Sequence, residues 1–145
     1  MKERLLISAC LMGENCKYNG GNNYTAAVEH LKEYYDLIPV CPERDGGLPT
    51  PRESSERRGE TVVSRSGNDV TEPFLRGAQL ALSTAIAHGC TCALLKERSP
   101  SCGCGTIYDG SFSGTVIPGD GVTAELLKQH GIRIFGESRI HELTR

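Results

Sequence analysis

The stretch Cys92-Ala93-Leu94-Leu95, followed closely by Glu97-Arg98-Ser99-Pro100-Ser101-Cys102-Gly103-Cys104-Gly105, decides how this 145-residue chain is interpreted. The apolar run belongs to a predicted strand over 91–96, because a short continuous apolar run bounded by turn residues is typical of a buried parallel strand. The segment after it is rich in Gly, Ser and Pro and predicts a loop. Cys102 is therefore expected just beyond the carboxyl end of a strand.

Two other cysteines follow strands in the same way. Leu5-Leu6-Ile7-Ser8-Ala9 leads into Cys10, and Leu37-Ile38-Pro39-Val40 leads into Cys41. In open α/β sheets, ligands gather outside the carboxyl ends of the strands. The three thiols are therefore expected at one edge of a sheet, where they form a candidate metal or cluster site.

Strands and helices alternate along the whole chain. The predicted strands cover 4–9, 37–41, 91–96 and 132–135. The predicted helices run from about 22 to 35, from about 71 to 89 and from 124 to 130, and a short helical tail ends the chain. This order predicts an α/β fold with a parallel sheet of about four strands and right-handed crossovers.

Local signals suggest where the helices begin and what lies between them. Candidate helix caps are Asn22 or Asn23, Asp69 or Thr71, and Thr123. The segment from 41 to about 68 is predicted to be a long irregular loop, functional or mobile, with Val62-Val63 as a short edge strand. The pattern of residues 106–116 predicts a small hairpin or flap, with residues typical of a turn at Asp109-Gly110.

Bulk composition limits the function classes. The chain has 16 Lys and Arg against 18 Asp and Glu, a net charge of -2, which gives no support to a nucleic-acid or membrane-surface role. No segment reaches the length of a transmembrane helix, and the first apolar run is too short for a signal-peptide core. We therefore expect a single domain over 1–145 that works in the cytoplasm.

The seven cysteines need an explanation, because an odd number in a reducing compartment argues against a disulfide framework. Structural zinc is often held by paired C-x2-C units, and the sequence contains none. The same absence disfavours a redox-active dithiol. Three thiolates with an open fourth position instead suit a [4Fe–4S] cluster whose unique iron is free for a substrate.

The other four cysteines receive different interpretations. Cys16 is the main rival ligand, although a buried thiol beside the site is slightly favoured for it. Cys90 and Cys92 are expected to point along one face and to belong to the core. Cys104 receives no role from the sequence.

Polar residues near the strand ends are candidates for catalysis. Glu43 follows Cys41 across Pro42, so both side chains are expected to project toward the same region, and a carboxylate beside a metal can act as general acid or base. A solvated loop glutamate is the alternative. Ser99 and Ser101 could bond a substrate or satisfy loop backbone groups. The remaining basic candidates, for which a solvated charged face is the simpler interpretation, are Lys96, Arg52, Arg57 and Arg58. None of the four histidines is assigned to the site.

Three blocks of the chain form a recognisable pattern. They are Ser8-Ala9-Cys10-Leu11-Met12-Gly13 with Cys16, then Pro39-Val40-Cys41-Pro42-Glu43 with Gly46-Gly47-Leu48-Pro49-Thr50-Pro51-Arg52, then Leu95-Lys96 with Ser99-Pro100-Ser101-Cys102-Gly103. In this order they resemble the thiouracil desulfidase family. The resemblance covers nearly the whole chain and is more specific for the family than for the substrate.

The resemblance implies a Rossmann-like, three-layer domain that holds an oxygen-sensitive [4Fe–4S] cluster through Cys10, Cys41 and Cys102. The implied chemistry is non-redox removal of sulfur from a thiolated pyrimidine such as thiouracil, giving uracil and hydrosulfide. The thiocarbonyl sulfur would bind the unique iron while water attacks the carbon. Glu43 matches the acid/base carboxylate of the family, and either Ser99 or Ser101 matches its serine.

One alternative stays open from the sequence alone. A zinc-binding or cysteine-rich structural module could bind a nucleotide without catalysis, and it would give colourless protein with stoichiometric zinc. The partner implied by the resemblance is a small-molecule thiolated nucleobase. Neither nucleic acid nor membrane is expected as a partner, and the chain is expected to be a monomer or weak homodimer.

Overall fold

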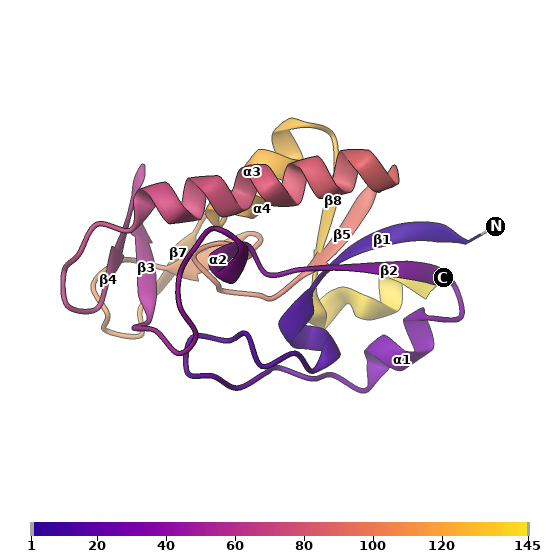
Figure 1. The fold of residues 1–145 in the computed structure, drawn as a ribbon, viewed down its shortest axis with the longest axis horizontal. Helices are drawn as coiled ribbons and strands as arrows, with labels where there is room; N and C mark the ends of the chain where they lie inside the picture. Colours follow the sequence, from indigo (N-terminus) through magenta and orange to yellow (C-terminus); the bar gives the residue numbers. More distant parts are fainter. Residues whose placement is uncertain (1, 145) are drawn as a thin grey trace.

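The computed structural model describes residues 2–144. Its main sheet consists of four parallel strands, which are β1 (Glu3–Ser8), β2 (Tyr35–Val40), β5 (Cys92–Leu95) and β8 (Arg133–Gly136). Their order across the sheet is β2-β1-β5-β8 (Figure 1). The predicted α/β fold with a small parallel sheet is confirmed.

Helices cover both faces of this sheet. α3 (Thr71–His88) and α4 (Val122–Gln129) pack together over one face. α1 (Ala27–Leu31) and the 3-10 segment η2 (Glu137–Thr144) lie together over the other (Figure 1). The three predicted layers follow from this arrangement.

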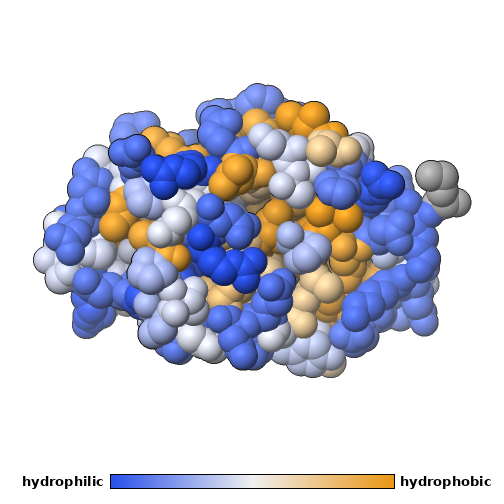
Figure 2. Space-filling model, in the orientation of Figure 1, coloured by the Kyte–Doolittle hydropathy of each residue, from blue (hydrophilic) through white to orange (hydrophobic). Residues whose placement is uncertain are grey.

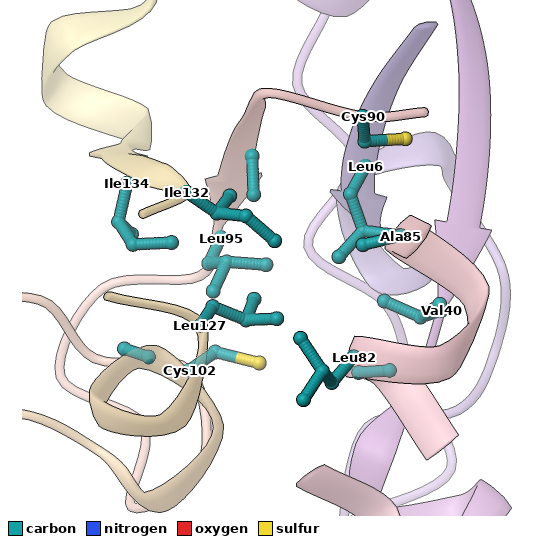
Figure 3. Packing of buried hydrophobic residues seen from close by; sticks show 13 residues of the cluster. Leu6, Val40, Leu82, Ala85, Cys90, Leu95, Cys102, Leu127, Ile132 and Ile134 are labelled. Carbon is teal, nitrogen blue, oxygen red and sulfur yellow. The ribbon is translucent and has the colours of Figure 1, made fainter. Parts of the chain in front are cut away.

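The core divides between the two faces because side chains alternate along each strand. Leu6 and Leu95 face α3 and α4, where they pack with Leu82 (Figure 3). Leu5 faces the opposite layer and packs with Leu31 of α1. A fully buried leucine side chain contributes about 1.5–3 kcal/mol relative to an exposed one, so these two clusters hold the layers on the sheet.

Cys90 and Cys92 do not share a face, and the prediction from their spacing is wrong on this point. Cys92 is the first residue of β5 and packs with the α1 layer, whereas Cys90 packs with the α3 layer. Cys90 precedes the strand, and its N–H donates to the Ala85 carbonyl in the turn after α3. Strand alternation therefore does not extend to it. Both thiols are buried in the core, as expected.

The first helix is much shorter than predicted. α1 covers only Ala27–Leu31, and β2 already begins at Tyr35, which pairs with Glu3 of β1. Aromatic residues favour strands. Neither Asn22 nor Asn23 caps the helix. The Asn22 side chain instead accepts a hydrogen bond from the Tyr24 N–H at 2.9 Å.

The two longer helices begin near the predicted positions, but their N-cap residues are Val70 and Gly121, and neither makes a side-chain capping bond. Asp69 Oδ1 accepts from the Thr71 N–H at 2.9 Å just before α3, while the Thr71 hydroxyl accepts from the Val62 N–H. α4 begins at Val122, so Thr123 lies inside its first turn and not at its cap. The Thr123 side chain is used for a tertiary contact described below.

The segment predicted to be irregular contains regular structure. It holds α2 (Pro42–Asp45) and an antiparallel hairpin of β3 (Ser55–Arg58) and β4 (Thr61–Ser64). Val62-Val63 lies in β4, so the predicted strand exists, but it pairs with β3 in a separate two-stranded sheet and is not an edge of the main sheet.

The predicted flap is present as a second antiparallel hairpin. β6 (Thr106–Tyr108) pairs with β7 (Val116–Pro118). The connecting loop spans 109–115, longer than a tight turn at Asp109-Gly110 would need. β3 packs against β6, so the two hairpins support one another beside the main sheet.

The face of the molecule that carries α3 mixes apolar and polar residues. Figure 2 shows hydrophobic residues interspersed with hydrophilic ones there. Exposed apolar side chains on α3 include Leu75, Leu80 and Ile86, and such scattered residues are normal on protein surfaces. Between residues 2 and 144, no helix combines the length and apolarity needed to cross a membrane.

Candidate active site

A cavity of about 720 Å³ opens at the carboxyl edge of the main sheet. Ser8 and Val40 line it at the ends of β1 and β2, and Lys96 lines it directly after β5. The cavity also contains four of the seven cysteines, which are Cys10, Cys16, Cys41 and Cys102. The structure therefore brings the three predicted thiols together, with the rival Cys16 beside them.

Cys10 enters the cavity from a 3-10 turn, η1 (Ala9–Met12), which continues directly from β1. Its half-buried sulfur accepts a hydrogen bond from Asn23 Nδ2 at 3.3 Å. Burial raises the pKa of the Cys10 thiol, and the Asn23 amide acts against that rise. The amide therefore favours the thiolate, which is the form of cysteine that binds metals.

Cys41 lies at the N-cap position of α2 and interacts directly with Cys16. A hydrogen bond from the Cys16 thiol lowers the pKa of Cys41 to about 7; the Arg44 N–H acts in the same direction, and burial opposes both. The same hydrogen bond, followed by burial, raises the pKa of Cys16. The Cys16 and Cys41 thiols thus interact within the cavity, and their contact favours the thiolate form of Cys41.

Cys102 is the most enclosed of the four thiols. Burial raises the pKa of Cys102 to about 12, while a hydrogen bond from the Ser8 hydroxyl lowers it and the nearby Cys10 and Glu43 raise it further. The Ser8 hydroxyl is itself oriented, because its oxygen accepts from the Lys96 N–H at 2.9 Å. A metal that coordinates a thiol deprotonates it outright, so Cys102 suits a ligand and not a free nucleophile.

Helix α2 is held on α3 by two glycines. Gly77 of α3 faces the Pro42 carbonyl, and Gly46 after α2 faces the Pro73 carbonyl, each so closely that a methyl side chain would overlap the oxygen. Glycine allows backbones to approach in this way. The contact fixes Glu43, and Cys41 just before the helix, against the 18-residue α3.

Glu43 forms a buried ion pair with Arg52. Their Oε1 and Nε atoms are 3.1 Å apart, and the side chains are only 18% and 7% exposed. Arg52 also donates to the carbonyls of Cys16 and Pro49. Burial raises the pKa of the Glu43 carboxyl, and the Arg52 charge and the Ser99 hydroxyl act against that rise. The pair therefore holds a carboxylate inside the cavity without fully compensating its desolvation.

The structure separates the two candidate serines. Ser99 lines the cavity, and its Oγ accepts from the backbone N–H groups of Ser101 at 3.1 Å and Cys102 at 3.0 Å. Its own proton is therefore directed to Glu43, with which it forms a hydrogen bond. The buried Ser101 hydroxyl instead bonds Thr123 Oγ1 at 2.7 Å and ties the cysteine loop to α4.

Comparisons with known proteins identify the family of this chain. The family model described as 2-thiouracil desulfurase matches residues 5–139. The chain belongs to the 2-thiouracil desulfurase family. It is 41% identical over 149 residues to the uncharacterized protein YbbK of Bacillus subtilis (strain 168), covering 96% of this chain and 99% of YbbK. It also matches the solved structure of TudS, a [4Fe–4S]-dependent thiouracil desulfidase, with 47% identity and a TM-score of 0.93, over 99% of this chain and 96% of TudS. The resemblance inferred from the three sequence blocks is confirmed.

In this member of the 2-thiouracil desulfurase family, the donor set fits a cluster better than a single ion. Across the described residues 2–144, no three His, Cys, Asp or Glu side chains converge closely enough to hold one metal ion. A tetrahedral zinc site needs such convergence. The thiolates of an iron–sulfur cluster bind different iron atoms, so thiols spread around a cavity match that donor set.

The other predicted candidates lie in several places. Lys96 lines the cavity and pairs with Glu137 at 3.3 Å. Arg57 is not a solvated side chain, because it is buried and pairs with Glu125 at 3.0 Å. Arg58 donates to the carbonyl of Gly110 in the flap. The residues that line the cavity include none of the four histidines, nor Cys90, Cys92 or Cys104.

The sequence did not predict that two donors, Ser8 and Asn23, contact the thiols of the site. Ser8 immediately precedes the turn that carries Cys10, and Asn23 lies in the Gly- and Asn-rich loop after it. Their position near a candidate ligand was the available signal. Glu56 and Phe112, which belong to the two hairpins and also line the cavity, carried no comparable signal.

Proposed function

We propose that this protein is a [4Fe–4S]-dependent desulfidase that removes sulfur from a thiolated pyrimidine such as thiouracil, giving uracil and hydrosulfide without net oxidation or reduction. The observation that carries the proposal is the meeting of Cys10, Cys41 and Cys102 with Glu43 in one cavity. The 0.93 TM-score to TudS, a [4Fe–4S]-dependent thiouracil desulfidase, supports it.

Cys10, Cys41 and Cys102 would hold the cluster. Each follows a different strand of the main sheet, and each receives a hydrogen bond that favours its thiolate, from Asn23, Cys16 and Ser8 respectively. A cluster held by three thiolates leaves one iron available as a Lewis acid that polarises a C=S bond.

Glu43 is the proposed general acid/base. Hydrolysis replaces the C=S bond by C=O: the oxygen of water bonds the carbon, and the sulfur departs with the electron pairs of the C=S bond. Of the two water protons, one goes to the sulfur to give hydrosulfide and one is released to solvent. A buried carboxylate with a raised pKa can take a proton from water and return it. Ser99 and Arg52 both hold this carboxylate at the wall of the cavity.

The setting of the reaction follows from the same observations. A small, partly enclosed cavity suits a free thiolated nucleobase as the substrate, and a net charge of -2 does not favour nucleic acid or a membrane surface. Seven free cysteines suit the reducing cytoplasm. We therefore infer a single cytoplasmic desulfidase domain over 1–145, acting as a monomer or weak homodimer.

Anaerobic reconstitution with iron and sulfide, followed by a visible spectrum and a thiouracil-to-uracil assay on the same sample, tests the proposal. Brown protein with turnover is the expected result. Brown protein without turnover would keep the cluster and remove the proposed substrate. Colourless protein that binds stoichiometric zinc would contradict the proposal and favour a structural module.

A further inference from the structure

Glu56 of β3 is a buried carboxylate that interacts with the flap. It is 9% exposed, and its Oε1 accepts hydrogen bonds from two backbone N–H groups, Gly110 at 2.9 Å and Phe112 at 3.1 Å. Both donors belong to the loop between β6 and β7. A single carboxylate oxygen thus fixes the backbone of this loop at two points.

The loop adopts a conformation that needs such support. Phe112 has φ of 57°, in the left-handed region that residues other than glycine rarely adopt. Gly110 also has positive φ, and its carbonyl accepts from Arg58 Nε at 2.7 Å. A residue held in an unfavourable conformation by surrounding bonds points to a functional constraint. The side-chain bonds to the backbone of Gly110 and Phe112 come from Glu56 and Arg58 of β3, on the other hairpin.

The constraint places an aromatic ring at the cavity. Phe112 lines the same cavity as the four thiols, Glu43 and Ser99. The guanidinium of Arg65 lies 5.9 Å from the centre of its ring, and this cation–π contact further limits the motion of the ring. The lining of the cavity therefore combines the four thiols with an aromatic ring supplied by the flap.

We propose that Phe112 is a specificity-determining residue that stacks on the planar ring of the substrate, and that Glu56 is the positioning residue that holds it there. This inference rests on the proposed function, in which the substrate is a thiolated pyrimidine. A stacked aromatic side chain selects for planar, unsaturated rings, because a saturated ring is puckered and has no π face. Glu56 Oε1 is occupied by the two loop amides, and although Glu56 also lines the cavity, its proposed effect on the substrate is through Phe112.

Two substrates that differ only in ring planarity test the idea. 2-Thiouracil and 5,6-dihydro-2-thiouracil share the thiocarbonyl and both ring N–H groups, but the second is saturated at C5–C6. The measured quantity is the ratio of their kcat/KM values on the reconstituted enzyme. Phe112→Leu is expected to reduce this ratio roughly 5- to 100-fold, mainly because the planar substrate binds less tightly. Leucine tolerates the positive φ no worse than phenylalanine, so folding is expected to be kept.

Variants of Glu56 then test the positioning role. Glu56→Ala removes both hydrogen bonds and is expected to reduce the ratio as Phe112→Leu does. Glu56→Gln keeps an acceptor oxygen and is expected to retain most of the ratio. Glu60→Gln removes an exposed carboxylate from the same hairpin and is the matched control, expected to leave the ratio unchanged.

Two results would overturn the inference. An unchanged ratio in Phe112→Leu would show that the ring does not select for planarity. Loss of kcat on both substrates in Glu56→Gln, with KM unchanged, would mean that Glu56 acts on the reacting atoms. If the wild-type enzyme turns over neither substrate, the proposed function fails. The stacking role is then decided separately by the ratio of the affinities for uracil and dihydrouracil, measured by calorimetry. A preference for uracil that Phe112→Leu abolishes supports stacking, and equal affinities refute it.

Discussion

Replacing Arg52 by methionine is expected to destabilise this protein far more than the loss of an ordinary ion pair. Arg52 is 7% exposed and Glu43 is 18% exposed, with 3.1 Å between Nε and Oε1. Removing one partner of a buried pair leaves an uncompensated charge and costs about 3–5 kcal/mol. The change also deprives the carbonyls of Cys16 and Pro49 and the Thr50 hydroxyl of their donor, so the upper part of this range is expected.

Urea titrations of the metal-free, reduced protein give the free energy of unfolding of each variant. A double-mutant cycle with Arg52→Met, Glu43→Gln and both changes together isolates the pair. The double variant is expected to be more stable than the sum of the single losses predicts, because no unpaired charge remains. Lys32→Met removes a solvent-exposed ion pair with Glu29 and serves as the control, with little effect expected.

Two outcomes would refute this reasoning about the buried pair. One is that Arg52→Met destabilises the protein no more than Lys32→Met does. The other is that the two single losses simply add, since the coupling between Glu43 and Arg52 would then be absent and the desolvation argument would fail.

Three further predictions concern the site. The Cys102→Ser variant is expected to lack the brown absorbance after reconstitution. The matched control is Cys104→Ser, which is expected to keep the absorbance because Cys104 does not line the cavity. Equal spectra would remove Cys102 from the ligand set. Glu43→Gln is expected to keep the cluster spectrum and to lower kcat on thiouracil roughly 100- to 10,000-fold, as loss of a general acid/base does; loss of the spectrum would instead make Glu43 structural or a ligand. Asn23→Leu removes the 3.3 Å N–H···S bond to Cys10 and is expected to make the reduction potential of the cluster more negative, since hydrogen bonds to sulfur help to set that potential. Spectroelectrochemistry checks this against Asn22→Leu, whose side chain bonds Asn15 and Tyr24 instead, and identical potentials in the two variants would contradict it.

The sequence predicted the main sheet because the four strands are short apolar runs bounded by turn residues. The same rule placed Cys10, Cys41 and Cys102 at strand ends, and parallel topology then implied that they meet. The first helix was overestimated because the helical spacing of Ala27, Val28, Leu31 and Tyr35 continues into a residue that pairs with β1. The periodicity of a short segment cannot reveal that one of its residues pairs with a strand far away in the sequence.

The parts of the site that the sequence left open depend on tertiary contacts. Ser99 and Ser101 are equivalent by spacing, and only tertiary contacts separate them: Ser99 bonds Glu43 in the cavity, whereas Ser101 bonds Thr123, 22 residues away. Arg52 was one of several basic residues until the fold paired it with Glu43. Glu56 and Phe112 are 56 residues apart, and no local pattern connects them.

The glycine contact between α2 and α3 has a consequence for how the site responds to distant change. No side chain lies between Gly77 and the Pro42 carbonyl, so a shift of α3 cannot be accommodated by a change of side-chain rotamer at this contact. A slide of α3 is therefore passed undiminished to Cys41 and Glu43, and a misplacement of about 1 Å can reduce a rate roughly 100-fold. The core contacts that α3 makes through Leu82 and Ala85 thus help to set the alignment of the Cys41 thiol and the Glu43 carboxylate.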